Sequence, residues 1–236
     1  MDASFADRLE KAGLTLSPHQ MDLFEVYRAL IKEWNAKIDI TAITEDREID
    51  NKHFIDSLSI FRQIKTPSQA RVMDMGSGGG FPGIPMKIYE PGLEMTLVDS
   101  LKKRVDFLRE VIDRLGLEGI RCIHARAEDL LRDPKERESY DLVVSRAVAP
   151  LPTLLEYCLP GVKINGQFIA MKGPGGQEEV IQSDRAIKTL GGHLERVDRF
   201  LWTEDNYQRT LVLIQKVKET PEKYPRGQGK PRKNPL

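Results

Sequence analysis

Apolar residues follow two different patterns along this chain. Between residues 18 and 34 they recur at every third or fourth position, which predicts an amphipathic helix. Ser17 and Pro18 suit the N-cap and the first residue of that helix. Further along the chain, short apolar runs alternate with helical stretches. Buried strands that alternate with helices are typical of the α/β class, with a mostly parallel central sheet and helices on both faces.

The same pattern divides the chain into three parts. Residues 1–70 are expected to form a helical N-terminal extension, residues 71–217 an α/β core, and residues 218–236 a Pro-rich, irregular tail. Residues 194–201 and 208–216 alternate well enough to predict an antiparallel pair that closes the sheet. The other expected strands are 71–75, 94–98, 120–124, 140–144 and 167–172, and the expected helices of the core are 83–89, 101–115, 129–132, 154–159 and 178–190.

A glycine-rich turn follows the first expected strand of the core. Asp74 lies at the carboxyl end of that strand, and Gly76, Gly78 and Gly80 follow it. Glycine allows the backbone to turn sharply and to approach a ligand, because it has no Cβ. In an open α/β sheet the first such turn faces the ligand crevice. The alternative is a tight turn between strand and helix that binds nothing.

The second expected strand ends in Asp99, which lies 23 residues after Gly76. An acid at this place can accept both hydroxyl groups of a ribose, or it can cap the helix expected at 101–115, and the two roles are compatible. The dinucleotide fingerprint requires a third glycine at position 81, where this chain has Phe81. That difference counts against an NAD(P) oxidoreductase.

The spacing Asp74-x-Gly76-x-Gly78-x-Gly80, followed by Asp99, resembles the S-adenosylmethionine site of the class I, Rossmann-like methyltransferases. The longer stretches 74–85 and 98–104 resemble a more specific group, the RsmG (GidB) family of bacterial 16S ribosomal RNA guanine-N7 methyltransferases. The similarity runs from about Trp34 to the tail and includes the Trp34-Asn35 pair and the 52–58 motif. It implies an enzyme that methylates one guanine in the decoding region of the small ribosomal subunit.

The resemblance also implies which residues form the site. Arg146, which follows the fourth strand, is the expected catalytic residue and would act by positioning. The adenine is expected at Ala127 and Glu128, where a backbone N–H and an acceptor oxygen can pair with the base; an acidic helix cap is the alternative reading of Glu128. The full set expected to bind the cofactor is Gly76, Ser77, Gly78, Phe81, Asp99, Ser100, Leu101, Ala127, Glu128 and Arg146.

The turn at residues 145–148 bears on the identity of the methyl acceptor. Enzymes that methylate exocyclic amines usually carry an Asn/Asp-Pro-Pro-aromatic motif there, and this turn lacks it. Neither Cys122 nor Cys158 lies in the Pro-Cys turn common among enzymes that attack pyrimidine C5. Guanine N7 has a free lone pair and no proton to lose, so it needs neither device. A methyltransferase for a small molecule or a protein remains the alternative.

Charge and composition indicate where the protein acts and what it binds. The formal net charge is zero, but residues 216–236 hold seven Lys or Arg and two Glu, a local charge of +5. The two cysteines are expected to be reduced core residues, and so few His and Cys predict no metal site. With no signal segment and no membrane-spanning apolar run, we expect a cytoplasmic monomer. Candidate RNA contacts, each with a structural or solvated role as its alternative, are His53, Arg126, Lys172, Arg209 and Arg226.

Overall fold

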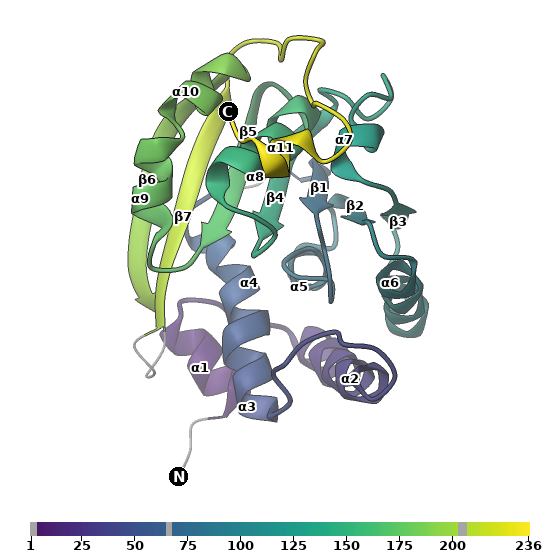
Figure 1. Ribbon diagram of the computed structural model, residues 1–236. Helices are drawn as coiled ribbons and strands as arrows, with labels where there is room; N and C mark the ends of the chain where they lie inside the picture. Colours follow the sequence, from purple (N-terminus) through teal and green to yellow (C-terminus); the bar gives the residue numbers. More distant parts are fainter. Residues whose placement is uncertain (1–3, 65–67, 203–206) are drawn as a thin grey trace.

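A seven-stranded sheet in the order β3-β2-β1-β4-β5-β7-β6 forms the centre of the protein (Figure 1). This computed structural model describes residues 4–64, 68–202 and 207–236. β7 runs antiparallel to both of its neighbours, and the other paired strands are parallel, so the predicted α/β class and the closing antiparallel pair are confirmed. The strands are β1 (Arg71–Met75), β2 (Glu94–Asp99), β3 (Ile120–His124), β4 (Tyr140–Arg146), β5 (Val162–Lys172), β6 (Gly192–Trp202) and β7 (Tyr207–Lys216).

The strand order reverses at β1. The chain moves outward from β1 to β2 and β3, and then returns to the other side of β1 with β4. Ligands of open α/β sheets bind where the order reverses in this way, beyond the carboxyl ends of the strands. Asp74 of β1 lies in register with Leu97 of β2 and with Val144 of β4. The turns that follow these three strands therefore meet at one edge of the sheet.

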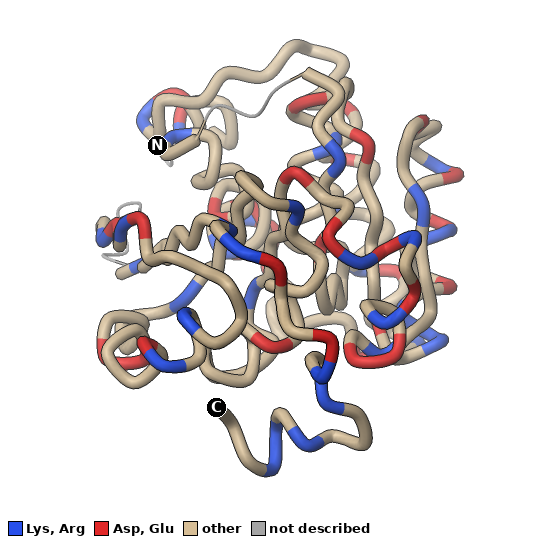
Figure 2. Tube along the Cα trace, turned by 90° about the horizontal axis from the view of Figure 1, so that it is seen from above, with Lys and Arg blue, Asp and Glu red and all other residues tan. Residues whose placement is uncertain are grey.

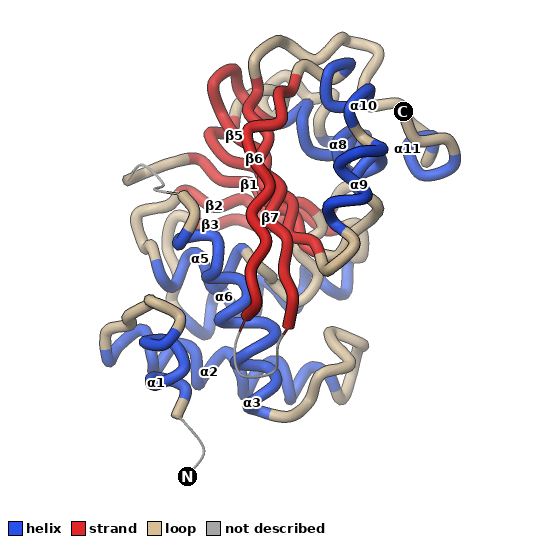
Figure 3. Tube along the Cα trace, turned by 90° about the vertical axis from the view of Figure 1, so that its left-hand side faces the viewer, coloured by secondary structure: helices blue, strands red, loops and turns tan. Residues whose placement is uncertain are grey.

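Helices cover both faces of the sheet (Figure 3). Successive strand residues point to opposite faces, so Val72 packs in one hydrophobic cluster and Met73 in the other. Helices α5 and α6 pack on the first face, and α8 and α10 pack on the second. The core helices are α5 (Gly83–Tyr89), α6 (Lys102–Leu115), α7 (Ala127–Leu130), α8 (Leu151–Cys158), α9 (Gly176–Gln182) and α10 (Asp184–Thr189).

The N-terminal helices belong to the first hydrophobic cluster. They are α1 (Phe5–Lys11), α2 (Pro18–Asn35), α3 (Asp46–Ile49) and α4 (Asp56–Leu58), with a π-helical turn (Asp50–Ile55) between the last two. The Ser17 hydroxyl accepts the N–H of Gln20, so the predicted cap of α2 is confirmed. The Tyr27 ring of α2 stacks on Phe54, and Trp34 packs against Phe107 of α6. Residues 4–62 therefore pack as a layer on one face of the sheet.

Several boundaries in the core differ from the predictions. The helix expected at 154–159 is α8, which begins earlier, at Leu151. The helix expected at 129–132 begins earlier, at the first residue of α7. The strand expected at 167–172 starts at Val162 and contains an irregularity, with Asn165 at a φ of +67°. The helix expected at 178–190 is two helices that meet at Ser183, whose hydroxyl donates to the carbonyl of Glu179. Such bonds from serine to its own helix compete with the regular pattern and favour a break.

The C-terminal tail is anchored to the core, and Lys and Arg predominate along it (Figure 2). It ends in a short helix, α11 (Lys230–Lys233), so the prediction of a wholly irregular tail was wrong there. Arg137 donates to the carbonyls of Thr220 and Tyr224. Arg226 forms a two-pronged ion pair with Glu156 of α8, which is fully buried. Part of the tail's positive charge is thus used inside the protein.

In the described part of the chain, no helix combines the length and the apolar character that a membrane span requires.

Arg226→Ala should lower the free energy of unfolding by about 3 kcal/mol, because it leaves the Glu156 carboxylate buried without its partner. Lys233→Ala is the matched control, since it removes the same charge from an exposed position of the tail. Chemical denaturation of both variants measures the difference. Equal stability would contradict the view that the tail is held through Arg226.

Candidate active site

The loop that follows β1 has a conformation that requires glycine. Gly76, Gly78 and Gly80 have φ values of +77°, +57° and +92°. A Cβ on Gly76 would lie 2.4 Å from Cγ2 of Val148, in the turn after β4. From the N-terminal layer, the Tyr27 hydroxyl donates a hydrogen bond to the carbonyl of Gly79. The loop is therefore held by α2 at Gly79 and by the turn after β4 at Gly76.

Gly78 faces open space. The nearest atom to a Cβ built on it is a backbone oxygen 4.0 Å away. Its N–H donates to Oδ2 of Asp99 at 2.9 Å, and Oδ1 of Asp99 accepts the N–H of Leu101 at 2.9 Å. Asp99 therefore joins the loop to the residue before α6. It does not cap that helix, because the N-cap residue is Leu101 and no side chain caps it, and the ribose role stays a prediction. A carboxylate has about four lone-pair positions, so both oxygens can still accept ribose hydroxyls.

Asp74, at the base of the loop, has a carboxylate oxygen without a partner. Its Oδ2 accepts the N–H of Gly83 at 3.0 Å, whereas Oδ1 is buried with no hydrogen bond to any described residue. Burial raises the pKa of Asp74 to about 7. A cationic or N–H group of a ligand would satisfy this oxygen. Asp74 belongs to the sequence motif of the loop but is absent from the site residues expected from the sequence.

Arg146 projects from the end of β4 and is fixed by the N-terminal layer. Its Nη1 donates to the carbonyl of Lys52 and to Oδ2 of Asp56, both at 2.8 Å. Its Nη2 lies 3.1 Å from Nδ1 of His53, and its guanidinium carbon lies 4.9 Å from the centre of the Phe81 ring. The next residue, Ala147, has a φ of +55°. Non-glycine residues adopt this conformation rarely, and such positions concentrate at functional sites.

His53 is a buried, neutral member of the same group. Its ring stacks on Phe81 with 4.4 Å between the ring centres, and its Nε2 lies 2.8 Å from the Thr41 hydroxyl. Burial, and then the charge of Arg146, lower the pKa of His53 to about 3. Nδ1 lies 3.1 Å from Nη2 of Arg146, which can only donate, and 3.1 Å from the carbonyl of Lys52, which can only accept, so these contacts are compatible with either neutral tautomer.

The structure brings Arg209 of β7 to the same place. Nη2 of Arg209 donates to Oδ2 of Asp56 at 2.8 Å, and its Nε donates to the other oxygen. Asp56 therefore links two arginines, although its side chain is completely buried. Asp56 is absent from the site residues expected from the sequence. Its place in the 52–58 motif is the sequence feature that could have indicated it.

The remaining candidates lie in different surroundings. Ala127 and Glu128 are buried at the start of α7. Lys172, proposed to bind RNA, instead donates to the carbonyl of Ala149 and pairs with Glu179. Arg126 is exposed, as is Ser100, whereas Arg226 is held at Glu156, outside this group. None of these contacts tests a role in binding, so the roles stay predictions.

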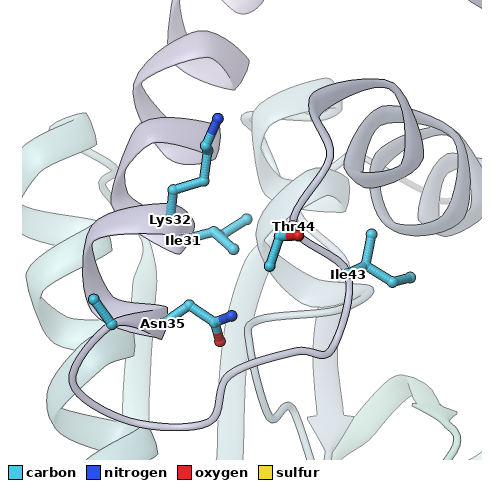
Figure 4. Close-up of a pocket in the computed structure, with 6 residues that line it drawn as sticks. Ile31, Lys32, Asn35, Ile43 and Thr44 are labelled. Carbon is cyan, nitrogen blue, oxygen red and sulfur yellow. The ribbon is translucent and has the colours of Figure 1, made fainter.

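A separate open pocket of about 300 Å³ lies between α2 and the segment after it (Figure 4). Asn35 lines it, and its Oδ1 accepts the N–H groups of Ile40 and Thr41. The pocket contains none of the predicted site residues, but Asn35 fixes Thr41, which contacts His53. In residues 4–64, 68–202 and 207–236, no three His, Cys, Asp or Glu side chains are grouped so that they could hold a metal ion.

The sequence matches known proteins over nearly its whole length. A family model described as rRNA small subunit methyltransferase G (GidB) matches residues 20–211. The ribosomal RNA small subunit methyltransferase G of Acetivibrio thermocellus is 52% identical over 224 residues, which cover 95% of this chain and 92% of that protein. The protein of the same name from Desulforamulus reducens is 50% identical and covers 94% of this chain and 92% of its own length.

Solved structures share the fold at low sequence identity. One chain from the complex of the Haloferax volcanii Trm112 methyltransferase activator with a putative methyltransferase has a TM-score of 0.59 at 15% identity, covering 80% of this chain and 98% of its own. M. jannaschii TYW2, solved in complex with AdoMet, has a TM-score of 0.55 at 14% identity, covering 76% and 81%. These likenesses concern the fold alone.

The imidazole of His53 should stay neutral between about pH 5 and 8, because burial and Arg146 both disfavour its protonation. NMR of the ring resonances measures this, with free imidazole in the same sample as a reference. The folded-state pKa, about 3, lies below the ordinary value of 6.5, so the unfolded chain binds the proton first. Any stability from neutral His53 is therefore present above pH 6.5 and is lost as the pH falls toward 3. A ring that titrates near pH 6.5 would refute the assigned environment.

Proposed function

The chain belongs to the rRNA small subunit methyltransferase G (GidB) family, and we propose that it transfers a methyl group from S-adenosylmethionine to N7 of one guanine in 16S ribosomal RNA. The observation that carries the proposal is the family match, with 52% identity to a relative over 95% of the chain. Family membership removes the oxidoreductase alternative.

The residues around the glycine loop fit the cofactor. When bound, S-adenosylmethionine supplies an electrophilic methyl group on a positively charged sulfur. The open space at Gly78 allows the backbone to approach a ligand, and Asp99 beside it has acceptor oxygens for a ribose. The unpartnered oxygen of Asp74 suits a ligand that carries an ammonium group. We place the adenine at Ala127 and Glu128, where α7 begins.

The chemistry of the acceptor fits a site without a general base. Attack by guanine N7 releases no proton from the base, so alignment of the lone pair with the methyl group supplies much of the acceleration. The low pKa of His53 makes it a poor proton acceptor at neutral pH. Arg146 cannot accept a proton at all, and several contacts fix its guanidinium. We therefore assign Arg146 a positioning role.

The candidate RNA contacts differ in whether they are already paired within the protein. Arg126 is an exposed candidate for phosphate contact, whereas His53, Lys172, Arg209 and Arg226 would have to share existing protein contacts. We propose that residues 71–217 are the catalytic core, with residues 1–70 as its extension. Since 16S rRNA is a component of the bacterial ribosome, we also propose that the protein acts in the cytoplasm, and as a monomer.

Gly78→Ala should weaken binding of S-adenosylmethionine by about tenfold or more, because the new methyl group enters the open space at the loop. Gly116→Ala is a matched control: its φ of +59° is close to the +57° of Gly78, and a Cβ there has no neighbour within 4 Å. Both substitutions carry a similar backbone cost of about 1 kcal/mol. Calorimetry that finds the same cofactor affinity in both variants would argue against the assigned loop.

The reaction itself is tested by the position of the methyl group. N7-methylguanine is cleavable by borohydride and aniline, so 16S rRNA from a strain lacking the native enzyme should gain one break after expression of this chain. The Gly78→Ala variant is the control and should restore little or no cleavage. Identical cleavage with and without the chain would refute N7 methylation and favour a different acceptor.

A further inference from the structure

Asp56 joins three separate parts of the molecule through one carboxylate. It lies in α4 of the N-terminal layer, and its two oxygens accept from Arg146 of β4 and from Arg209 of β7. The Asp56 side chain is 0% exposed, and the two arginine side chains are 10% and 13% exposed. Burying an ionised carboxylate is costly unless cations or hydrogen-bond donors compensate for it, so the three groups depend on one another.

The contacts leave part of the Arg146 guanidinium available. Of its five N–H groups, the two on Nη1 pair with the Lys52 carbonyl and with Asp56, and one on Nη2 pairs with His53. The Nε–H and the second Nη2–H have no hydrogen-bond partner among the described residues. The chain thus fixes the plane of the guanidinium and leaves two donors for a ligand.

We propose that Asp56 is a positioning residue of the methyl-transfer site, which acts by holding Arg146 in the orientation that the reaction needs. The inference rests on the proposed function. A group that is fixed before the reaction does not have to reorganise during it. The contacts that fix the group increase the rate because they remove this cost. Without the carboxylate, two neighbouring cations would repel each other, and Arg146 would lose one of its three hydrogen bonds.

The chain contains a matched control for this residue. Asp50 lies in the same helical stretch, is also buried, and also pairs with two arginines, Arg8 at 2.6 Å and Arg28 at 2.8 Å. Its two partners both belong to the N-terminal layer. Asp50→Asn therefore reproduces the loss of a buried, doubly paired carboxylate while Arg146 and Arg209 keep Asp56 as their partner.

The test is a double-mutant cycle on methyl transfer to small ribosomal subunits, measured at saturating cofactor. Asp56→Asn should lower kcat by about 10- to 100-fold, the range expected when a reacting group is misplaced. Asp50→Asn should change kcat by less than about twofold while it lowers the unfolding midpoint to a similar extent. Combined with Arg146→Ala, Asp56→Asn should cause no further loss. A wild-type kcat in Asp56→Asn, or losses that multiply in the double variant, would overturn the inference.

A second measurement does not depend on turnover. In the free protein, the Arg146 guanidinium should give slowly exchanging NMR signals, identified by their loss in Arg146→Ala. These signals should vanish in Asp56→Asn and persist in Asp50→Asn; signals that survive in Asp56→Asn would overturn the inference. A wild-type protein that gives these signals but transfers no methyl group would instead refute the proposed function.

Discussion

The ion pairs at Asp56 connect the N-terminal helices to the edge of the sheet where the parallel strands end. Burying a carboxylate costs several kcal/mol, which only well-placed cations can offset. Here the cations come from two different strands, Arg146 of β4 and Arg209 of β7. If either arginine paired with another group, the buried carboxylate of Asp56 would lose a cationic partner. The same ion pairs therefore fix the position of the helical layer and the orientation of Arg146.

The glycine loop depends on the same layer. Tyr27 holds the carbonyl of Gly79, and His53 stacks on the ring of Phe81. A Cβ on Gly80 would lie 2.6 Å from the Tyr27 oxygen, so the close approach of α2 also requires glycine at that position. The layer therefore does more than cover apolar strands, because it also shapes the glycine loop. Phe81, where a dinucleotide-binding protein has glycine, is explained by these contacts with His53 and Arg146.

Local pattern was enough to predict most of the fold. The strands of the parallel sheet are short buried runs, and the turn glycines and Asp99 have a characteristic spacing, so each is readable within about 30 residues. The contacts of Asp56 with Arg209 span 153 positions, and no local pattern encodes them. The sequence also could not predict that Oδ1 of Asp74 lacks a hydrogen-bond partner. A motif shows which residue is present, but not which of its atoms lacks a partner. The helix break at Ser183 was missed because a hydrogen bond from the serine hydroxyl to the carbonyl of Glu179 accompanies it, and the apolar pattern does not show that bond.

Charge shows most clearly why composition is a weak guide to an RNA-binding surface. The tail has a local excess of positive charge, yet Arg226 is neutralised by a buried glutamate. Lys172 and Arg209 are likewise paired with carboxylates inside the protein. A protein cation strengthens binding to RNA when it contacts a phosphate and releases the counterion bound there. Only a cation without another partner can do this. A cation that already neutralises a buried carboxylate contributes little, because moving it would leave that carboxylate unpaired. The number of basic residues in the sequence therefore exceeds the number that are available to an RNA, and the exposed cations, such as Arg126, are the better candidates.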